Sequence, residues 1–242
     1  MNDHELAAAL AAEAGRLLLD VRTEFADAPS EERKAAGDMR SHDLLIEQLA
    51  AARPGDAVLS EEGADDLIRL RSDRVWIVDP LDGTREFADP GRADWAVHVA
   101  LWSGGELIAG AVALPARGVT LATPQVPPLP AAPAVPRIVV SRTRPPAVAL
   151  RVRAALGATL VEMGSAGAKV AAVVQGDAEV YVHAGGQYEW DSAAPVAVAR
   201  AAGLHTSRID GSPLRYNQSE LLLPDLVVCR PQYAQAVLAA LR

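Results

Sequence analysis

The sequence predicts a mixed α/β protein whose chain is divided into two halves, and three observations support this prediction. Apolar residues recur first with a helical period and then with a strand period over residues 1–123. Residues 124–136 are rich in proline and predict a stiff junction without regular structure. Over residues 137–242, short apolar strands alternate with helical segments, which is α/β order.

The first half opens with two predicted helices. Residues 4–23 place one apolar stripe on a helical face, made of Leu6, Leu10, Ala14, Leu17, Leu18 and Val21. Residues 24–37 are charged and irregular and predict a mobile loop. A second helix is expected to begin near residues 38–41 and to stop at Pro54-Gly55.

Strand patterns complete the first half and alternate with helices in the second. The expected strands are residues 57–59, 75–78, 95–102, 107–114, 119–122, 138–140, 160–163 and 180–182. Ser103-Gly104-Gly105 predicts a hairpin turn. The expected helices of the second half are residues 146–156, 164–175, 190–202 and 233–242.

Composition narrows the class of protein. The chain has 242 residues, half of them hydrophobic, which predicts a folded globular protein. Its net charge of −8 argues against a partner that is a nucleic-acid polymer. No apolar run reaches the length of a membrane span, and the first residues lack a signal-peptide pattern. Cys229 is the single cysteine and lies in an apolar run, so we expect an inert thiol and a cytoplasmic protein.

A loop after the second predicted strand carries the strongest chemical signal. Four apolar residues, 75–78, lead directly into Asp79, and the loop adds Asp82, the Leu81 carbonyl and the Thr84 hydroxyl. Hard oxygen ligands this close together suit Mg²⁺ or Mn²⁺. The spacing of the two acids fits neither an EF-hand loop nor a phosphatase with an aspartate nucleophile. An ordinary Asp-Gly turn remains the alternative for Asp82-Gly83 alone.

Four other positions each allow two interpretations. Glu61 and Glu62 follow a strand end, where they are a solvated turn or metal ligands. Asp191, at a helix start, is an N-cap or a metal ligand. Gly164-Ser165 allows close helix packing or offers N–H groups to a phosphate. Lys169 reaches a substrate anion or extends to solvent, the second being favoured.

Three motifs in order resemble the inositol monophosphatase family. Asp79-Pro-Leu-Asp82-Gly-Thr84, preceded by Trp-Ile-Val, is similar to its signature loop. Ser60-Glu61-Glu62 resembles its upstream Glu-Glu pair, and Trp190-Asp191-Ser192-Ala193-Ala194 its later Trp-Asp motif. Thr84-Arg85-Glu86-Phe87 resembles the branch of 3′(2′),5′-bisphosphate nucleotidases, which cleave 3′-phosphoadenosine 5′-phosphate (PAP). The inositol-cleaving branch tends to carry Asn in place of Glu86.

The resemblance implies a layered α-β-α-β-α fold with a metal site between the halves. One Mg²⁺ would be held by Glu61, Asp79 and the Leu81 carbonyl, and a second by Asp79, Asp82 and Asp191. A third, weaker ion would join near Glu61, and Mn²⁺ would substitute for Mg²⁺. The chain departs from the family in the segment Lys34-Ala35-Ala36-Gly37 before Asp38.

The resemblance also implies the catalytic roles. Thr84, assisted by an aspartate, would orient and deprotonate the attacking water. Asp38 occupies the position of that aspartate in the family, and Asp43 is the nearest other candidate. The alternative role for Asp38 is to cap the predicted helix. Glu61 is the alternative base. The residues expected to bind substrate are Glu61, Leu81, Asp82, Gly83, Thr84, Gly164, Ser165, Lys169 and Asp191.

The expected function is Mg²⁺-dependent removal of the 3′-phosphate of PAP or its sulfate. The alternatives are an inositol monophosphatase or fructose-1,6-bisphosphatase on the same scaffold, and a metal-binding protein without turnover. The resemblance further implies sensitivity to lithium and a homodimer.

Overall fold

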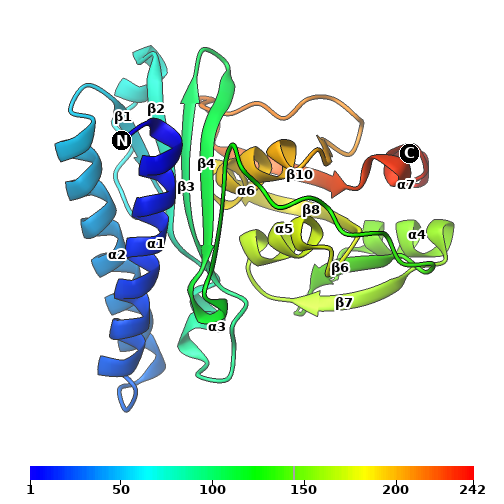
Figure 1. The fold of residues 1–242 in the computed structure, drawn as a ribbon, viewed down its shortest axis with the longest axis horizontal. Helices are drawn as coiled ribbons and strands as arrows, with labels where there is room; N and C mark the ends of the chain where they lie inside the picture. Colours follow the sequence, from blue (N-terminus) through cyan, green and yellow to red (C-terminus); the bar gives the residue numbers. More distant parts are fainter. Residues whose placement is uncertain (144) are drawn as a thin grey trace.

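Two five-stranded sheets organise the computed structural model, which describes residues 1–143 and 145–242 (Figure 1). The first sheet has the order β1-β2-β3-β4-β5. Its strands are β1 (Ala57–Ser60), β2 (Arg74–Asp82), β3 (Ala96–Ser103), β4 (Glu106–Leu114) and β5 (Val119–Ala122). The second has the order β7-β6-β8-β10-β9. Its strands are β6 (Arg137–Ser141), β7 (Thr159–Met163), β8 (Val180–Tyr188), β9 (His205–Ser207) and β10 (Leu222–Cys229).

Helices form three layers around the sheets, which gives the α-β-α-β-α order expected from the resemblance. α1 (Asp3–Glu24) and α2 (Ser30–Ala52) cover the outer face of the first sheet, and α4 (Ala147–Leu156) and α7 (Pro231–Leu241) that of the second (Figure 1). α5 (Ala166–Gln175) and α6 (Glu189–Ala201) lie between the sheets. Nearly every residue of α5 is buried, as expected of a helix that is apolar on all sides.

An irregularity in β2 turns the predicted metal loop away from a regular strand. Asp79 pairs with His98 of β3, but Asp82 pairs with Ala96, so two residues of β2 face one residue of β3. Such a bulge redirects the side chains beside it. Gly83 follows at φ 89°, where a side chain would be strained, and opens the short helix α3 (Thr84–Ala88).

The prediction of a mobile loop over residues 24–37 was wrong, because α2 begins at Ser30 rather than near Asp38. The buried Arg33 side chain donates hydrogen bonds to the carbonyls of Phe25, Ala26 and Ala88. These bonds hold the α1–α2 turn in one compact conformation. Of the charged residues at the start of α2, Glu31 and Glu32 are exposed, whereas Arg33 is buried.

Gly37 lies inside α2 because the helix passes very close to the metal loop. A Cβ at this position would lie 2.8 Å from Phe87 and 2.9 Å from Leu81. A glycine that suggested a break in the chain is thus a packing contact. The helix keeps this close approach at a cost of roughly 1 kcal/mol in helix propensity.

The other predicted helices and strands lie within a few residues of their expected positions, except that β8 extends to Tyr188 and pairs with β10. The short elements α3 and β9 were not predicted. Residues 124–136 contain no helix or strand. The division of the chain into halves at this segment stays a prediction. Burial of Cys229 in β10 raises the pKa of its thiol to about 12, as expected of an inert cysteine. In the described part of the chain no helix combines the length and apolarity needed to cross a membrane.

Candidate active site

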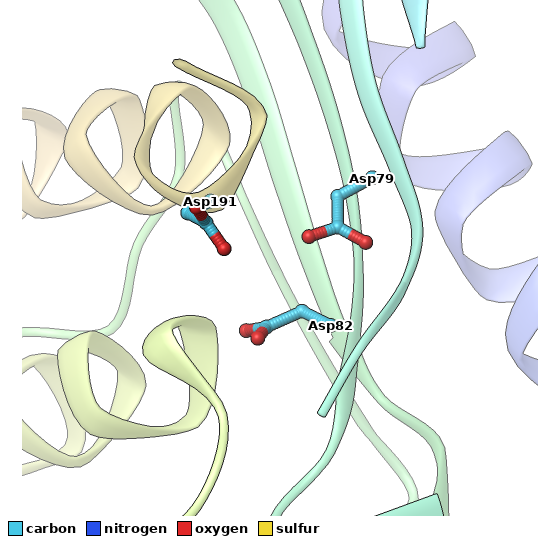
Figure 2. A group of neighbouring side chains, drawn as sticks. All are labelled: Asp79, Asp82 and Asp191. Carbon is cyan, nitrogen blue, oxygen red and sulfur yellow. The ribbon is translucent and has the colours of Figure 1, made fainter. Parts of the chain in front are cut away.

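Three aspartates converge between the two sheets. Asp79 and Asp82 lie at the end of β2, and Asp191 lies in the first turn of α6 (Figure 2). One carboxylate oxygen from each lies within 4.8 Å of the others. Asp79 and Asp82 are 1% and 7% exposed. The structure therefore brings together three of the five predicted metal ligands, although Asp191 is more than a hundred residues away in sequence.

Local hydrogen bonds orient two of these carboxylates. Oδ1 of Asp79 accepts the N–H of Leu81 at 3.0 Å, which stabilises the irregular turn. Oδ2 of Asp191 accepts the N–H of Tyr188 at 2.6 Å. Asp191 is the third residue of α6 and forms a capping box with Tyr188. The interpretation of Asp191 as the N-cap was wrong, because Tyr188 is the N-cap, but its carboxylate still has acceptor capacity for a metal ion.

Two carboxyl groups of the acid cluster, those of Asp79 and Asp191, hold their protons more tightly than in water. Burial, followed by repulsion from Glu61 and Asp82, raises the pKa of Asp79 well above its ordinary value. Burial and the charge of Asp82 raise the pKa of Asp191 to about 6. Buried carboxylates without a cation are unfavourable. Oxygen ligands with excess negative charge are the donor set that a divalent cation fits.

Glu61 lies at the margin of this cluster. It follows β1, and its carboxyl group forms a hydrogen bond with that of Asp79. Desolvation, with repulsion from Asp191 as the next cause, raises the pKa of Glu61 to about 7. No oxygen of Glu61 belongs to the compact group of Asp79, Asp82 and Asp191 in the described residues. The carbonyl of Leu81 accepts the Thr84 hydroxyl at 3.3 Å.

Asp82 differs from its neighbours because its charge is stabilised. Burial opposes ionisation, but hydrogen bonds from His98, Ser165 and the Gly167 N–H outweigh it and lower the pKa of Asp82 to about 2. The Ala166 N–H also donates to Asp82, at 3.1 Å. Asp82 therefore sits at the N-terminus of α5, where a helix stabilises negative charge.

His98 is a residue of the site that sequence reasoning did not recognise. It is fully buried in β3, and its Nε2 lies 3.2 Å from Oδ2 of Asp82. Its Nδ1 donates to the carbonyl of Trp190 at 3.0 Å, since a carbonyl only accepts. Burial opposes protonation, but the hydrogen bond and charge of Asp82 raise the pKa of His98. His98 thus connects Asp82 to the residue before Asp191.

The N–H groups at the start of α5, predicted to be offered to a phosphate, have partners within the protein. The N–H groups of Ala166 and Gly167 donate to Asp82, and the N–H of Gly164 donates to Asp94. These donors therefore serve carboxylates of the protein. Gly164 and Ser165 nevertheless line a cavity of about 280 Å³ that also includes Asp82, Gly83 and Thr84.

The expectation that Lys169 extends to solvent was wrong. Its side chain is 6% exposed, and its Nζ donates to the carbonyls of Gly164 and Ser165. The ammonium also lies 5.5 Å from the centre of the Tyr181 ring. Burial lowers the pKa of Lys169. Lys169 therefore fixes the backbone of Gly164 and Ser165, just before α5, through these hydrogen bonds.

The structure brings Thr84 and Asp38 together across α2 and α3. The Thr84 hydroxyl lies 3.4 Å from Oδ1 of Asp38, which is long for a hydrogen bond between two oxygens. Burial, followed by repulsion from Glu62, raises the pKa of Asp38 to about 6. Asp38 lies well inside α2, so the explanation that it caps the helix is wrong. A carboxylate with this pKa is suited to act as a base near neutral pH.

Comparison with known proteins agrees with the fold. The model of the inositol monophosphatase family matches residues 3–242. The chain is 57% identical to the 3′-phosphoadenosine 5′-phosphate phosphatase of Mycobacterium tuberculosis (strain CDC 1551 / Oshkosh), over 95% of this chain and 89% of that protein. It is 51% identical to the phosphatase of the same name from Mycobacterium leprae (strain TN), over 100% and 94%. The crystal structure of CysQ from Bacteroides thetaiotaomicron superposes with a TM-score of 0.77 at 28% identity, over 93% of this chain and 96% of that one. The chain therefore belongs to the inositol monophosphatase family.

Proposed function

We propose that this protein is a phosphomonoester hydrolase that removes the 3′-phosphate of PAP or of its sulfate. The products are AMP or adenosine 5′-phosphosulfate, with phosphate. The observation that carries the proposal is the compact group of Asp79, Asp82 and Asp191 beside a cavity lined by Thr84. The mycobacterial relatives that carry the name PAP phosphatase support the choice of substrate.

The proposed cofactor is Mg²⁺, and the donor set of the site supports it. Asp79, Asp82 and Asp191 would hold one ion, and Glu61, Asp79 and the Leu81 carbonyl another, with a third near Glu61. Mn²⁺ accepts the same oxygen ligands. Bound divalent cations supply charge neutralisation of the phosphate and a lower pKa for water.

The protein's own residues complete the proposed chemistry. The Thr84 hydroxyl orients a water toward the phosphorus, and Asp38 accepts the proton that Thr84 relays. The contact between them is long at 3.4 Å, as is common for catalytic hydrogen bonds without substrate. Glu61, with its pKa raised to about 7, is the alternative base. The N–H groups of Gly83 and Thr84 are proposed donors to the phosphate, and Gly164 and Ser165 a wall of the substrate site.

The wider setting of the protein is also a proposal. A single buried cysteine supports a cytoplasmic location. The net charge of −8 argues against a nucleic-acid polymer or an anionic membrane surface as partner. It does not exclude a small phosphorylated substrate, because bound divalent ions change the local charge. Lithium inhibition and a homodimer follow from family membership.

The direct test is phosphate release from a panel of phosphomonoesters with Mg²⁺. We expect a higher kcat/KM for PAP than for inositol 1-phosphate or fructose 1,6-bisphosphate. The opposite ranking would favour an inositol or sugar phosphatase on the same scaffold. Mg²⁺ binding without release from any substrate would identify a metal-binding protein without turnover.

A further inference from the structure

The cavity beside the acid cluster also has cationic walls. In addition to residues 82–84, it is lined by Arg85, Glu86, Arg142 and Thr143. Arg85 belongs to α3 and is exposed, and Arg142 follows β6 in the second half of the chain. In a protein of net charge −8, two guanidinium groups beside one cavity favour an anion there.

Arg142 is held in place at both its backbone and its side chain. Its N–H donates to the carbonyl of Met163 at 3.1 Å. Its Nη2 donates to Oε1 of Glu86 at 3.0 Å. The side chain is nevertheless 38% exposed. Because a guanidinium has five N–H donors in a rigid fork, one carboxylate partner leaves donors available to a ligand.

Glu86 orients the side chain of Arg142 through this ion pair. The glutamate is only 8% exposed and lies on α3, directly after Thr84 and Arg85. A buried carboxylate requires a partner, and Arg142 supplies it across the two halves of the chain. The ion pair removes the repulsion that Glu86 would otherwise exert on an anion in the cavity. Glu86, which also lines the cavity, thereby positions Arg142.

We propose that Arg142, positioned by Glu86, binds the phosphate that the enzyme does not cleave, namely the 5′-phosphate of a nucleoside 3′,5′-bisphosphate. Arg85 flanks the same group. This inference rests on the proposed function, because it assigns the second phosphate of that substrate. Arginine recognises phosphate through paired, charge-assisted hydrogen bonds. A cavity of about 280 Å³ lies just below the usual range for ligand pockets, which begins at about 300 Å³, so it accommodates the phosphorylated ribose of the substrate rather than the whole nucleotide.

The kinetic test compares PAP with adenosine 3′-monophosphate, which lacks the 5′-phosphate. Loss of a charge-assisted hydrogen bond costs about 10- to 100-fold. We expect Arg142→Ala to lower kcat/KM for PAP by about this factor, mainly through KM, and to leave adenosine 3′-monophosphate within about twofold. Arg142→Lys restores the charge but not the fork, so it should recover part of the loss.

Glu86→Gln tests the positioning role. It keeps the shape of the side chain but removes the charge, so it should produce the same selective loss of PAP activity, smaller than that of Arg142→Ala. The double variant should equal Arg142→Ala, because Glu86 acts only through Arg142. Arg153→Ala, on the exposed face of α4, is the matched control and should change kcat/KM for neither substrate.

A binding measurement separates this inference from the proposed function. Calorimetry in EDTA compares the binding of adenosine 5′-monophosphate with that of adenosine. Arg142→Ala should weaken the binding of the nucleotide and leave that of adenosine unchanged. If the wild type cleaves neither adenosine phosphate, the proposed function fails and calorimetry alone decides the anion site. Equal losses on both kinetic substrates, or unchanged nucleotide binding in Arg142→Ala, overturn the inference.

Discussion

The acid cluster should make the metal-free protein less stable, and replacing one aspartate should reveal the magnitude. Asp191 is suited to this test because its pKa is raised from 3.8 to about 6, chiefly by burial. A raised pKa means that the folded state holds the proton more tightly than the unfolded state. Below about pH 4 Asp191 is protonated in both states, so its ionisation does not lower the free energy of unfolding. Above about pH 6 it is ionised in both states, and the free energy of unfolding is lowered by the full difference. The difference corresponds to roughly 3 kcal/mol of unfolding free energy.

We expect Asp191→Asn to be more stable than the wild type in EDTA at pH 8, because asparagine carries no charge and can still accept the Tyr188 N–H. About 3 kcal/mol corresponds to a rise in Tm of roughly 6–12 °C at most for a chain of this length. Thermal unfolding from pH 4 to pH 8 measures the effect, and the Tm difference should disappear toward pH 4. Saturating Mg²⁺ should reduce or reverse the Tm difference between Asp191→Asn and the wild type, because ligand at a hundredfold its Kd stabilises the wild type by about 2.7 kcal/mol.

Asp225 provides a matched control of opposite sign. Its hydrogen bond with Arg208 lowers the pKa of Asp225, so its charge stabilises the fold. Asp225→Asn should therefore lower the Tm at pH 8, with a difference that fades as the pH falls below about 4. If Asp191→Asn is no more stable than the wild type in EDTA at pH 8, or if its advantage is unchanged at pH 4, the proposed cost of ionising the buried Asp191 is refuted.

Four other changes test the site. Asp79→Asn should abolish phosphate release while circular dichroism shows a folded protein; residual activity near wild type would exclude Asp79 as the shared ligand. Asp38→Asn and Thr84→Ala should each lower kcat by about 10²- to 10⁴-fold with little change in Mg²⁺ requirement, and the double variant should be hardly worse than either; an active Asp38→Asn enzyme would make Glu61 the base. His98→Asn should raise the Mg²⁺ concentration for half-maximal activity by about 10- to 100-fold, and an unchanged requirement would leave His98 a packing residue. Lithium should inhibit turnover at millimolar concentration, and complete insensitivity would contradict the inferred site.

Local sequence determined the metal loop and most of the secondary structure. The apolar run before Asp79 makes a buried strand, and Pro80 with Gly83 interrupts that strand where two carboxylates occur. These are short-range effects of backbone geometry and burial, so periodicity and turn residues reveal them. The start of α2 was missed because contacts with distant carbonyls, made by Arg33, override the irregular local pattern.

Only the tertiary structure decided which polar groups meet. Asp191 reaches Asp79 and Asp82 because α6 packs between the two sheets. The pairing of β2 with β3, with its bulge, places His98 against Asp82, and the approach of the two halves joins Glu86 to Arg142. No local pattern encodes these distances, because they depend on sheet pairing and on how closely helices of small residues approach. The chain alone thus determined which groups are available for catalysis, and long-range packing determined their partners and their charge.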